Sequence, residues 1–284
     1  MSQIVLVVHA IKPRAAELAA SARTWWLGAK REVLEVSGTD SSASLHIDAK
    51  DVELVVSLGG DGTMLRAVEL AHPSSAPVLG VNLGRIGYLT EVDAADMERA
   101  FEQFAAGEFT ITERMTIQLE IRLSGSRLPD EDTTPHPLVA LNEAVVEKVE
   151  HGHTIRFNVW ISGNRFLTYA ADGLILSTPT GSTAYNLSAR GPILSPTLRA
   201  MVLTPISPHM LLDRSLVLDP SASVTLELVD GPRATLVIDG GRQFELRPGD
   251  AVVCQTGDHP ARIVSFGRSD FLTVLRDKFG LADR

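Results

Sequence analysis

The sequence predicts two domains: an α/β domain with a Rossmann-like parallel sheet, and an all-β sandwich domain. Between residues 4 and 106, short apolar runs alternate with helical patterns, which is typical of parallel strands that are covered on both faces. From about residue 112, apolar and polar residues alternate with a period of two, which is typical of antiparallel strands with one solvated face. Residues 269–279 return to a helical pattern.

The domain boundaries follow from these changes of period. We expect residues 1–111 and 268–284 to form the α/β domain and residues 112–267 to form the β-sandwich. A chain of 284 residues with 44% hydrophobic content can bury two cores of this kind.

The first domain is expected to alternate strands and helices. Its predicted strands are residues 4–8, 33–36, 54–58 and 78–82. Its predicted helices are residues 14–30, 63–72 and 94–106. Pro13 suits the first position of a helix, and Met97, Ala100, Phe101 and Phe104 form one apolar stripe.

The second domain is expected to contain short alternating strands. They lie at residues 117–123, 138–149, 155–161 and 224–228, and around Leu236, Phe244, Val252 and Ile263. Residues 124–137 are polar and contain three prolines, which indicates an exposed connection.

The last predicted helix has a separate role in this organisation. Ser269 is its expected N-cap and Gly280 follows its end. Phe271, Leu272 and Phe279 share one face, and a lone amphipathic helix needs a surface to cover. We therefore expect it to return to the first domain.

Charge and composition exclude several classes of protein. The chain has 26 basic and 35 acidic residues, a formal balance of −9, which argues against a nucleic-acid surface. Its single cysteine, Cys254, cannot form an internal disulfide. With no apolar run near 18 residues and no basic region ahead of the first apolar run, we expect no membrane association and a cytoplasmic location.

The first motif is GGDGT at residues 59–63, between a predicted strand and a predicted helix. Glycines permit positive φ and close approach of a ligand, and the N–H groups that open a helix favour anions, so the turn suits phosphate. Asp61 would repel that phosphate unless it accepts a proton, orients a hydroxyl or shares a metal. The pattern therefore favours phosphoryl transfer; a plain turn in which Asp61 caps the helix is the alternative.

Two neighbouring features sharpen this interpretation. Leu65 stands where the dinucleotide fingerprint has its third glycine, and no P-loop motif is present, so an NAD-dependent oxidoreductase is disfavoured. Arg66 lies about one turn into the helix, where it either reaches a phosphate or is an ordinary surface arginine.

Two further motifs interrupt the β pattern. Asn142 and Glu143 place an amide and a carboxylate in an otherwise apolar strand, where a charged group needs a partner unless it lies on the solvated face. Residues 177–185, STPTGSTAY, contain six hydroxyl residues in nine positions, which marks either a binding segment or a Ser/Thr-rich turn.

These three motifs, in this order and approximate spacing, resemble those of the NAD kinase family, and the resemblance spans about residues 4–279. It implies transfer of phosphate from ATP to the 2′-hydroxyl of the adenosine ribose of NAD, giving NADP, with a divalent cation, expected to be Mg²⁺. It also implies NAD binding by the β-sandwich domain and a homodimer or homotetramer assembled through it. ATP, another nucleoside triphosphate and polyphosphate remain candidate donors.

The first motif is shared with phosphofructokinases and with lipid kinases of the diacylglycerol and sphingosine type. A lipid or sugar kinase that shares only this loop, and a non-catalytic nucleotide sensor, are therefore the alternatives.

The resemblance also implies the site residues. Asp61 is the expected catalytic carboxylate and also a nucleotide contact. The other expected NAD or nucleotide contacts are Gly62, Arg66, Asn142, Glu143, His153, Asp172, Thr180, Thr183, Ala184, Tyr185 and Ser188. No metal ligand is assigned. Gly241 departs from members that carry glutamine at this position, which removes a side-chain contact there.

Overall fold

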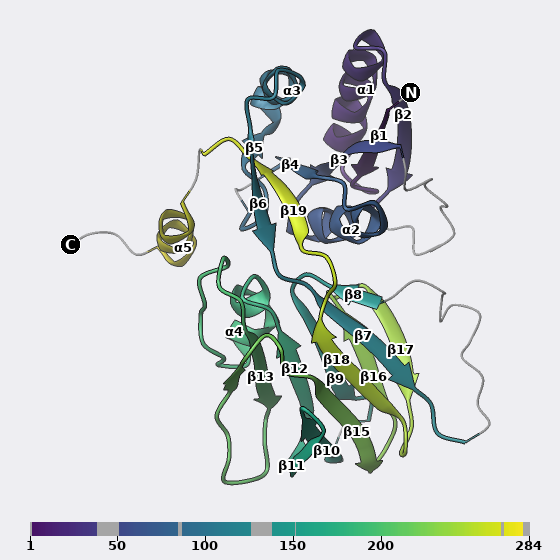
Figure 1. The fold of residues 1–284 in the computed structure, drawn as a ribbon, viewed down its shortest axis with the longest axis vertical. Helices are drawn as coiled ribbons and strands as arrows, with labels where there is room; N and C mark the ends of the chain where they lie inside the picture. Colours follow the sequence, from purple (N-terminus) through teal and green to yellow (C-terminus); the bar gives the residue numbers. More distant parts are fainter. Residues whose placement is uncertain are drawn as a thin grey trace. The chain divides into compact units, whose positions relative to one another are not determined.

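The chain folds into two units, which Figure 1 shows as ribbons. The first consists of Met1–Arg114 with Pro260–Arg284, and the second of Met115–His259. The computed structural model describes residues 2–38, 51–84, 87–125, 138–150, 152–267 and 270–280. An α/β unit and an antiparallel β unit confirm the predicted fold class.

This division differs from the predicted boundaries at two strands. β6 (Thr110–Arg114) and β19 (Ala261–Ser265) pair antiparallel with each other, and β19 also pairs parallel with β4 (Val78–Asn82). The stretch around Ile263, which its alternation assigned to the second domain, is therefore a strand of the first unit. A period of two shows which faces a strand presents but does not show which sheet it joins.

The sheet of the first unit has the strand order β2-β1-β3-β4-β19-β6, and β5 pairs with β4. The bounds of its other strands are β1 Gln3–Val8, β2 Glu32–Ser37, β3 Val52–Gly59 and β5 Val92–Asp93. The pairs among β1 to β4 are parallel. Because the chain passes from β2 back across β1 to β3, the sheet has a switch point between β1 and β3, where open α/β sheets bind ligands.

Three helices cover this sheet: α1 (Pro13–Gly28), α2 (Asp61–Ala71) and α3 (Met97–Ala105). Short 3-10 turns follow α2 at His72–Ser74 and precede α3 at Ala94–Asp96. Pro13 opens α1 and the predicted stripe of α3 is buried, as expected. The rings of Trp26 and Phe101 meet at 5.0 Å between centroids, which joins α1 to α3. Successive residues of β1 are buried, as a strand covered on both faces requires.

The last helix, α5 (Phe271–Phe279), belongs to the first unit, as predicted. Its N-terminus is capped by Asp270, whose carboxylate accepts a hydrogen bond from the Thr273 N–H at 3.2 Å; the predicted cap Ser269 lies outside the described residues. None of its residues is buried, and Leu272 is 67% exposed. The apolar face is therefore covered only in part: Phe271, Val274 and Leu275 are half-buried. Lys278 lies 4.9 Å from the ring centroid of Tyr88.

The second unit consists of two antiparallel sheets, with strand orders β11-β10-β15-β18-β7-β8 and β14-β13-β12-β9-β16-β17. The strands of the first of these sheets are β7 Ile117–Arg122, β8 Leu138–Ala140, β10 Ile155–Ile161, β11 Asn164–Ala171, β15 Val224–Asp230 and β18 Ala251–Thr256. Those of the other are β9 Glu143–Lys148, β12 Gly173–Ser177, β13 Met201–Ile206, β14 Leu216–Leu218, β16 Ala234–Ile238 and β17 Arg242–Leu246. A 3-10 turn, Gly181–Thr183, and the short α4, Tyr185–Ser188, follow β12.

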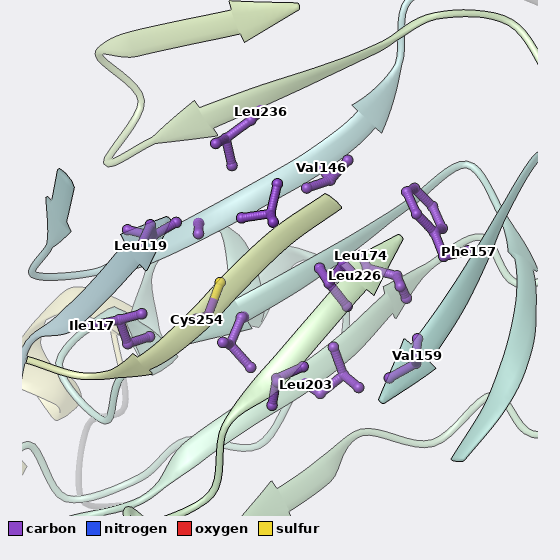
Figure 2. Close-up of a cluster of buried hydrophobic side chains, with 14 of the residues drawn as sticks. Ile117, Leu119, Val146, Phe157, Val159, Leu174, Leu203, Leu226, Leu236 and Cys254 are labelled. Carbon is purple, nitrogen blue, oxygen red and sulfur yellow. The ribbon is translucent and has the colours of Figure 1, made fainter. Parts of the chain in front are cut away.

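The core of the second unit is formed by alternate residues of its strands, among them Leu119, Phe157 and Leu236 (Figure 2). Cys254 lies within it, and burial raises the pKa of its thiol to about 12, so the thiol stays protonated. Most of the predicted connection, residues 126–137, falls outside the described residues. Within the described ranges, no helix has the length and apolarity that a membrane span needs.

Candidate functional site

The glycine turn of the first unit joins β3 directly to α2. None of its three glycines has positive φ, so the turn does not use the left-handed conformation that glycine permits. At Gly59 a Cβ would lie 2.1 Å from the Thr63 hydroxyl oxygen, whereas at Gly60 and Gly62 it would meet nothing within 4 Å. Close packing therefore explains the first glycine, and the backbone is open to an approaching ligand at the other two.

The carboxylate of Asp61 holds a second loop in place. Its Oδ2 accepts a hydrogen bond from the Tyr88 N–H and its Oδ1 one from the Leu89 N–H, both at 3.1 Å. Gly87 lies against it, because a Cβ there would be 1.9 Å from Oδ1. The N-cap residue of α2 is Gly60, without a side-chain cap, so the alternative in which Asp61 caps its own helix is wrong.

The surroundings of Asp61 suit an anion on the N-terminal side of α2. The first N–H groups of an α-helix lack partners within the helix and carry the positive end of its dipole. Gly62, in this first turn, is exposed. The charge of Asp61, together with burial as the larger cause, raises the pKa of the Tyr88 phenol.

Arg66 is not an exposed surface arginine. Its side chain is only 10% exposed and forms an ion pair with Glu69 through Nη1. Its Nε and Nη2 are buried and have no hydrogen-bond partner within the described part of the chain. A buried guanidinium with unused donors is a suitable contact for an oxyanion.

In the second unit, residues 141–143 lead into β9: Asn142 lies in a turn, and Glu143 is the first residue of the strand. The backbone of these residues is held by Asp239: Oδ2 accepts from the Leu141 N–H at 2.7 Å, and Oδ1 accepts from the Asn142 and Glu143 N–H groups at 2.8 and 3.0 Å. The Asp239 N–H in turn donates to the Glu143 carbonyl oxygen at 3.0 Å. Sequence reasoning noted residues 239–241 only for Gly241 and missed this carboxylate.

The hydroxyl-rich segment is interlocked with the same turn, so it is not a mere Ser/Thr-rich loop. The Thr178 N–H donates to the Asn142 carbonyl at 2.8 Å, and its hydroxyl donates to the Leu141 carbonyl at 2.6 Å. Gly181 packs so closely that a Cβ would lie 2.1 Å from the Asn142 carbonyl oxygen. Glycine is therefore required there by contact.

Asn186, which sequence reasoning also missed, holds the segment from the other side. Its side-chain amide donates to the carbonyl oxygens of Ser182 and Pro192, both at 3.1 Å, and accepts from the Thr204 hydroxyl at 2.7 Å. Asn186 is completely buried beside Tyr185 in α4. The sequence did offer one signal for this role: Asn186 is polar and directly follows Tyr185, the last hydroxyl residue of the motif.

Glu143 does not lie on a solvated strand face, because only 6% of it is exposed. Burial, followed by the negative charge of Asp239, raises its pKa to about 8, against the opposing effect of a hydrogen bond from the Tyr185 backbone. Within the described residues its Oε2 has no hydrogen-bond partner, and neither has the buried hydroxyl of Thr180. These two buried polar atoms are available for hydrogen bonds to a ligand.

Asp172 and Tyr185 lie in the same neighbourhood. Asp172 forms an ion pair with Lys148 at 2.6 Å, and His209 Nε2 lies 4.0 Å from its carboxylate. Burial raises the pKa of Tyr185, as do the charges of Glu147 and Asp172 and the hydrogen bond between its phenol and Glu147. The Tyr185 ring remains 39% exposed and is available for stacking.

The other expected contacts differ in how closely they join this cluster. The Thr183 hydroxyl bonds to the Thr180 carbonyl at 3.4 Å, and Ala184 lies between the 3-10 turn and α4. Ser188 ends α4 and is exposed. His153 is exposed on the loop between β9 and β10, and no hydrogen bond or ion pair among the described residues joins it to the cluster.

The described residues contain no group of three or more His, Cys, Asp or Glu side chains that would hold a metal ion. Kinase sites usually bind Mg²⁺ through one or two carboxylates and the phosphates of the substrate. In the phosphate turn, Asp61 is the available carboxylate.

Comparisons with known proteins agree on one family. A model of the ATP-NAD kinase N-terminal domain matches residues 29–109, and one of the ATP-NAD kinase C-terminal domain matches residues 141–266. The NAD kinase of Heliobacterium modesticaldum is 38% identical over 98% of both chains. That of Koribacter versatilis is 34% identical over the whole of both.

Solved structures share the fold. Yeast NADH kinase in complex with NADH matches with a TM-score of 0.82 and 21% identity, over 100% of this chain and 89% of its own. An NAD kinase from Archaeoglobus fulgidus in complex with ATP matches with a TM-score of 0.73 and 22% identity, over 100% of both chains.

Proposed function

Because the chain belongs to the NAD kinase family, we propose that it transfers the terminal phosphate of ATP to the 2′-hydroxyl of the adenosine ribose of NAD, giving NADP. The observation that carries this proposal is the carboxylate of Asp61, held in the glycine turn by two backbone N–H groups. A protein that only senses a nucleotide has no use for a fixed carboxylate beside a phosphate. The match over both domain models disfavours a lipid or sugar kinase that shares the turn alone.

Asp61 is assigned to orient the attacking hydroxyl and to take its proton. In a loose phosphoryl-transfer transition state the proton leaves late, so position matters more than base strength. The carboxylate of Asp61 is the group assigned to accept that late proton. The Tyr88 and Leu89 N–H groups restrict the carboxylate, which favours one orientation toward the hydroxyl.

The phosphate charge is offset by groups near the same turn. We assign the open N–H groups around Gly62 and the unused donors of Arg66 to the phosphate oxygens. A divalent cation, expected to be Mg²⁺, would be held by the donor phosphates with Asp61 as the available carboxylate, and would supply further neutralisation.

The second unit is assigned to NAD. Asn142, Glu143 and Thr180 offer polar atoms to hydroxyl and adenine groups, two of which the protein itself leaves unused. Tyr185 offers a ring face to a base, and Asp172 lies beside it. The remaining assigned contacts are Thr183, Ala184, Ser188 and His153, of which His153 has the least support.

One assay tests the reaction. Purified protein is incubated with Mg²⁺, NAD and either ATP, another nucleoside triphosphate or polyphosphate, and NADP is measured with an NADP-specific dehydrogenase. We expect NADP with ATP. Phosphorylation of a lipid or sugar without any NADP would overturn the proposal.

We also infer a homodimer or homotetramer assembled through the second unit. Its sheets end in β11, β8, β14 and β17, and exposed strand edges are usually covered in stable proteins. Exposed apolar residues lie on two of these strands, Phe166 on β11 and Val217 on β14. A monomer by light scattering would refute this. Because ATP and NAD are intracellular metabolites, we expect the activity in the cytoplasm.

A further inference from the structure

Asp239 occupies a position that the hairpin between β16 and β17 specifies closely. Asp239 and Gly240 have φ of 48° and 68°, and the Gly241 N–H bonds to the Ile238 carbonyl at 2.9 Å. Positive φ at both central residues is what a type I′ hairpin turn requires, and Asp-Gly is a preferred pair for it. The turn therefore fixes where the carboxylate of Asp239 projects.

That carboxylate holds three successive backbone N–H groups, of Leu141, Asn142 and Glu143. An ionised carboxylate accepts at both oxygens, whereas an amide has only one acceptor. Because the Asp239 N–H also bonds to the Glu143 carbonyl, four hydrogen bonds join the hairpin to the turn that carries the unused Oε2 of Glu143.

We propose that Asp239 is a positioning residue of the dinucleotide site: its carboxylate holds residues 141–143 in the binding geometry. This inference rests on the proposed function, because it takes Asn142 and Glu143 as NAD contacts. Asp239 acts through these residues and is not assigned a contact of its own with the ligand.

The groups around Glu143 support a specific role for the charge of Asp239. Its neighbour across the ladder on β12 is Ser177, which does not titrate, and Asp239 is the charged group that acts on it most strongly. The hydrogen bond from the Tyr185 backbone opposes the effect of Asp239. Farther along the cluster, Asp172 is paired with Lys148, and His209 lies beside Asp172.

The test compares D239N and D239G with the matched control D250N. Asparagine and glycine both tolerate positive φ, so neither strains the hairpin. Asp250 is buried and, like Asp239, accepts backbone N–H groups, those of Ser124 at 2.7 Å and Arg247 at 2.9 Å, but it lies in the turn between β17 and β18. D250N therefore reports what loss of a structural carboxylate does to the same unit.

Affinity for NAD is measured by calorimetry, and steady-state kinetics give KM and kcat. We expect Kd for NAD to rise roughly tenfold in D239N, which loses one acceptor, and roughly 100-fold in D239G, with kcat changed less than KM. D250N is expected to lower Tm without changing Kd. If D239N weakens NAD binding no more than D250N does, the positioning role is wrong.

The pH dependence of Kd tests the charge. In the unmodified protein we expect a break in log Kd near pH 8, where Glu143 titrates. Removing the charge of Asp239 lowers the pKa of Glu143, so the break moves to lower pH in D239N but not in D250N. It disappears in E143Q, which has no group that titrates at this position. A break that stays in place in D239N overturns the charge effect.

The two proposals fail separately. If no NADP forms but NAD still binds and binding depends on Asp239, the reaction assignment is wrong and the positioning role stands. If NADP forms and D239N behaves like D250N, the reaction stands and the positioning role is wrong. Absence of NAD binding in the unmodified protein overturns the positioning role.

Discussion

Asp61 in the first unit and Asp239 in the second hold loops by the same means, yet we assign them different roles. Each carboxylate accepts backbone N–H groups from a distant segment: Asp61 from Tyr88 and Leu89, and Asp239 from Leu141, Asn142 and Glu143. Asp61 lies in a glycine turn whose backbone is open at Gly60 and Gly62. Asp239 has its oxygens turned to the backbone of the binding turn.

The difference shows that a carboxylate bound to backbone amides has no single function. What separates the two is the space beside them: open backbone next to Asp61, and the buried, unused Oε2 of Glu143 next to Asp239. The open backbone beside Asp61 suits a carboxylate that takes part in the reaction. The arrangement at Asp239 suits a carboxylate that positions another residue.

The largest effect is expected for D61N. Asparagine keeps the size of the side chain but cannot take the proton, so kcat should fall roughly 100-fold or more while NAD still binds. Steady-state kinetics and NAD calorimetry measure the two quantities, with D93N in β5 as a control of the same chemistry. Near-normal turnover of D61N together with loss of turnover in E143Q would exchange the two assigned roles.

G87A tests whether the loop that binds Asp61 matters for the reaction. The new methyl group would lie 1.9 Å from Asp61 Oδ1 and must displace the carboxylate or the loop. Since a small misplacement of a reacting group can cost roughly 100-fold, we expect kcat to fall by roughly 10- to 100-fold. G28A, where a Cβ meets nothing within 4 Å, should leave kcat unchanged. Equal kinetics of G87A and G28A would show that the position of Asp61 is not critical.

E143Q tests the binding side of the comparison. The amide keeps the shape of Glu143 but changes the hydrogen bonds offered to the ligand, so KM for NAD should rise by roughly tenfold while kcat changes less. Steady-state kinetics of E143Q and the unmodified protein give the fold-change in KM for NAD and the fold-change in kcat, which are then compared. A larger fall in kcat than rise in KM would move Glu143 from binding to the chemical step.

The smallest effect concerns stability and pH. The pKa of Glu143 is about 8 in the folded protein and about 4.5 for the free side chain. Between pH 4.5 and pH 8, the folded protein therefore binds a proton at Glu143 that the unfolded chain releases. The free energy of unfolding falls as pH rises through this range. Glutamine does not titrate. We therefore expect the Tm of E143Q, minus the Tm of the unmodified protein, to increase by a few degrees between pH 5 and pH 8. A constant difference in Tm across this range would contradict the raised pKa.

Much of the fold was readable from local patterns. The apolar stripe of α3 and the proline that opens α1 identified these helices correctly, and the change from helical period to alternation identified the two kinds of domain. A local period of hydrophobic residues shows which face of a helix or strand is buried, and this relation holds for helices and strands in general. The period also located the three motifs, because each interrupts such a pattern with polar or glycine residues.

Local patterns therefore specify the fold class, most elements of the first unit and the segments that carry chemistry, whereas the strands β11, β13 and β14 and the break between β8 and β9 were not predicted. Three contacts are visible only in the folded chain: β19 joins the first sheet, Asp61 binds the loop at residues 88–89, and Asp239 holds the turn 97 positions away at Asn142. The physical reason is that these partners are set by strand order and by close approach of backbone to backbone, which no local period encodes. The same reason explains the glycines: Gly59, Gly87 and Gly181 are required by neighbours in space and not by their own φ.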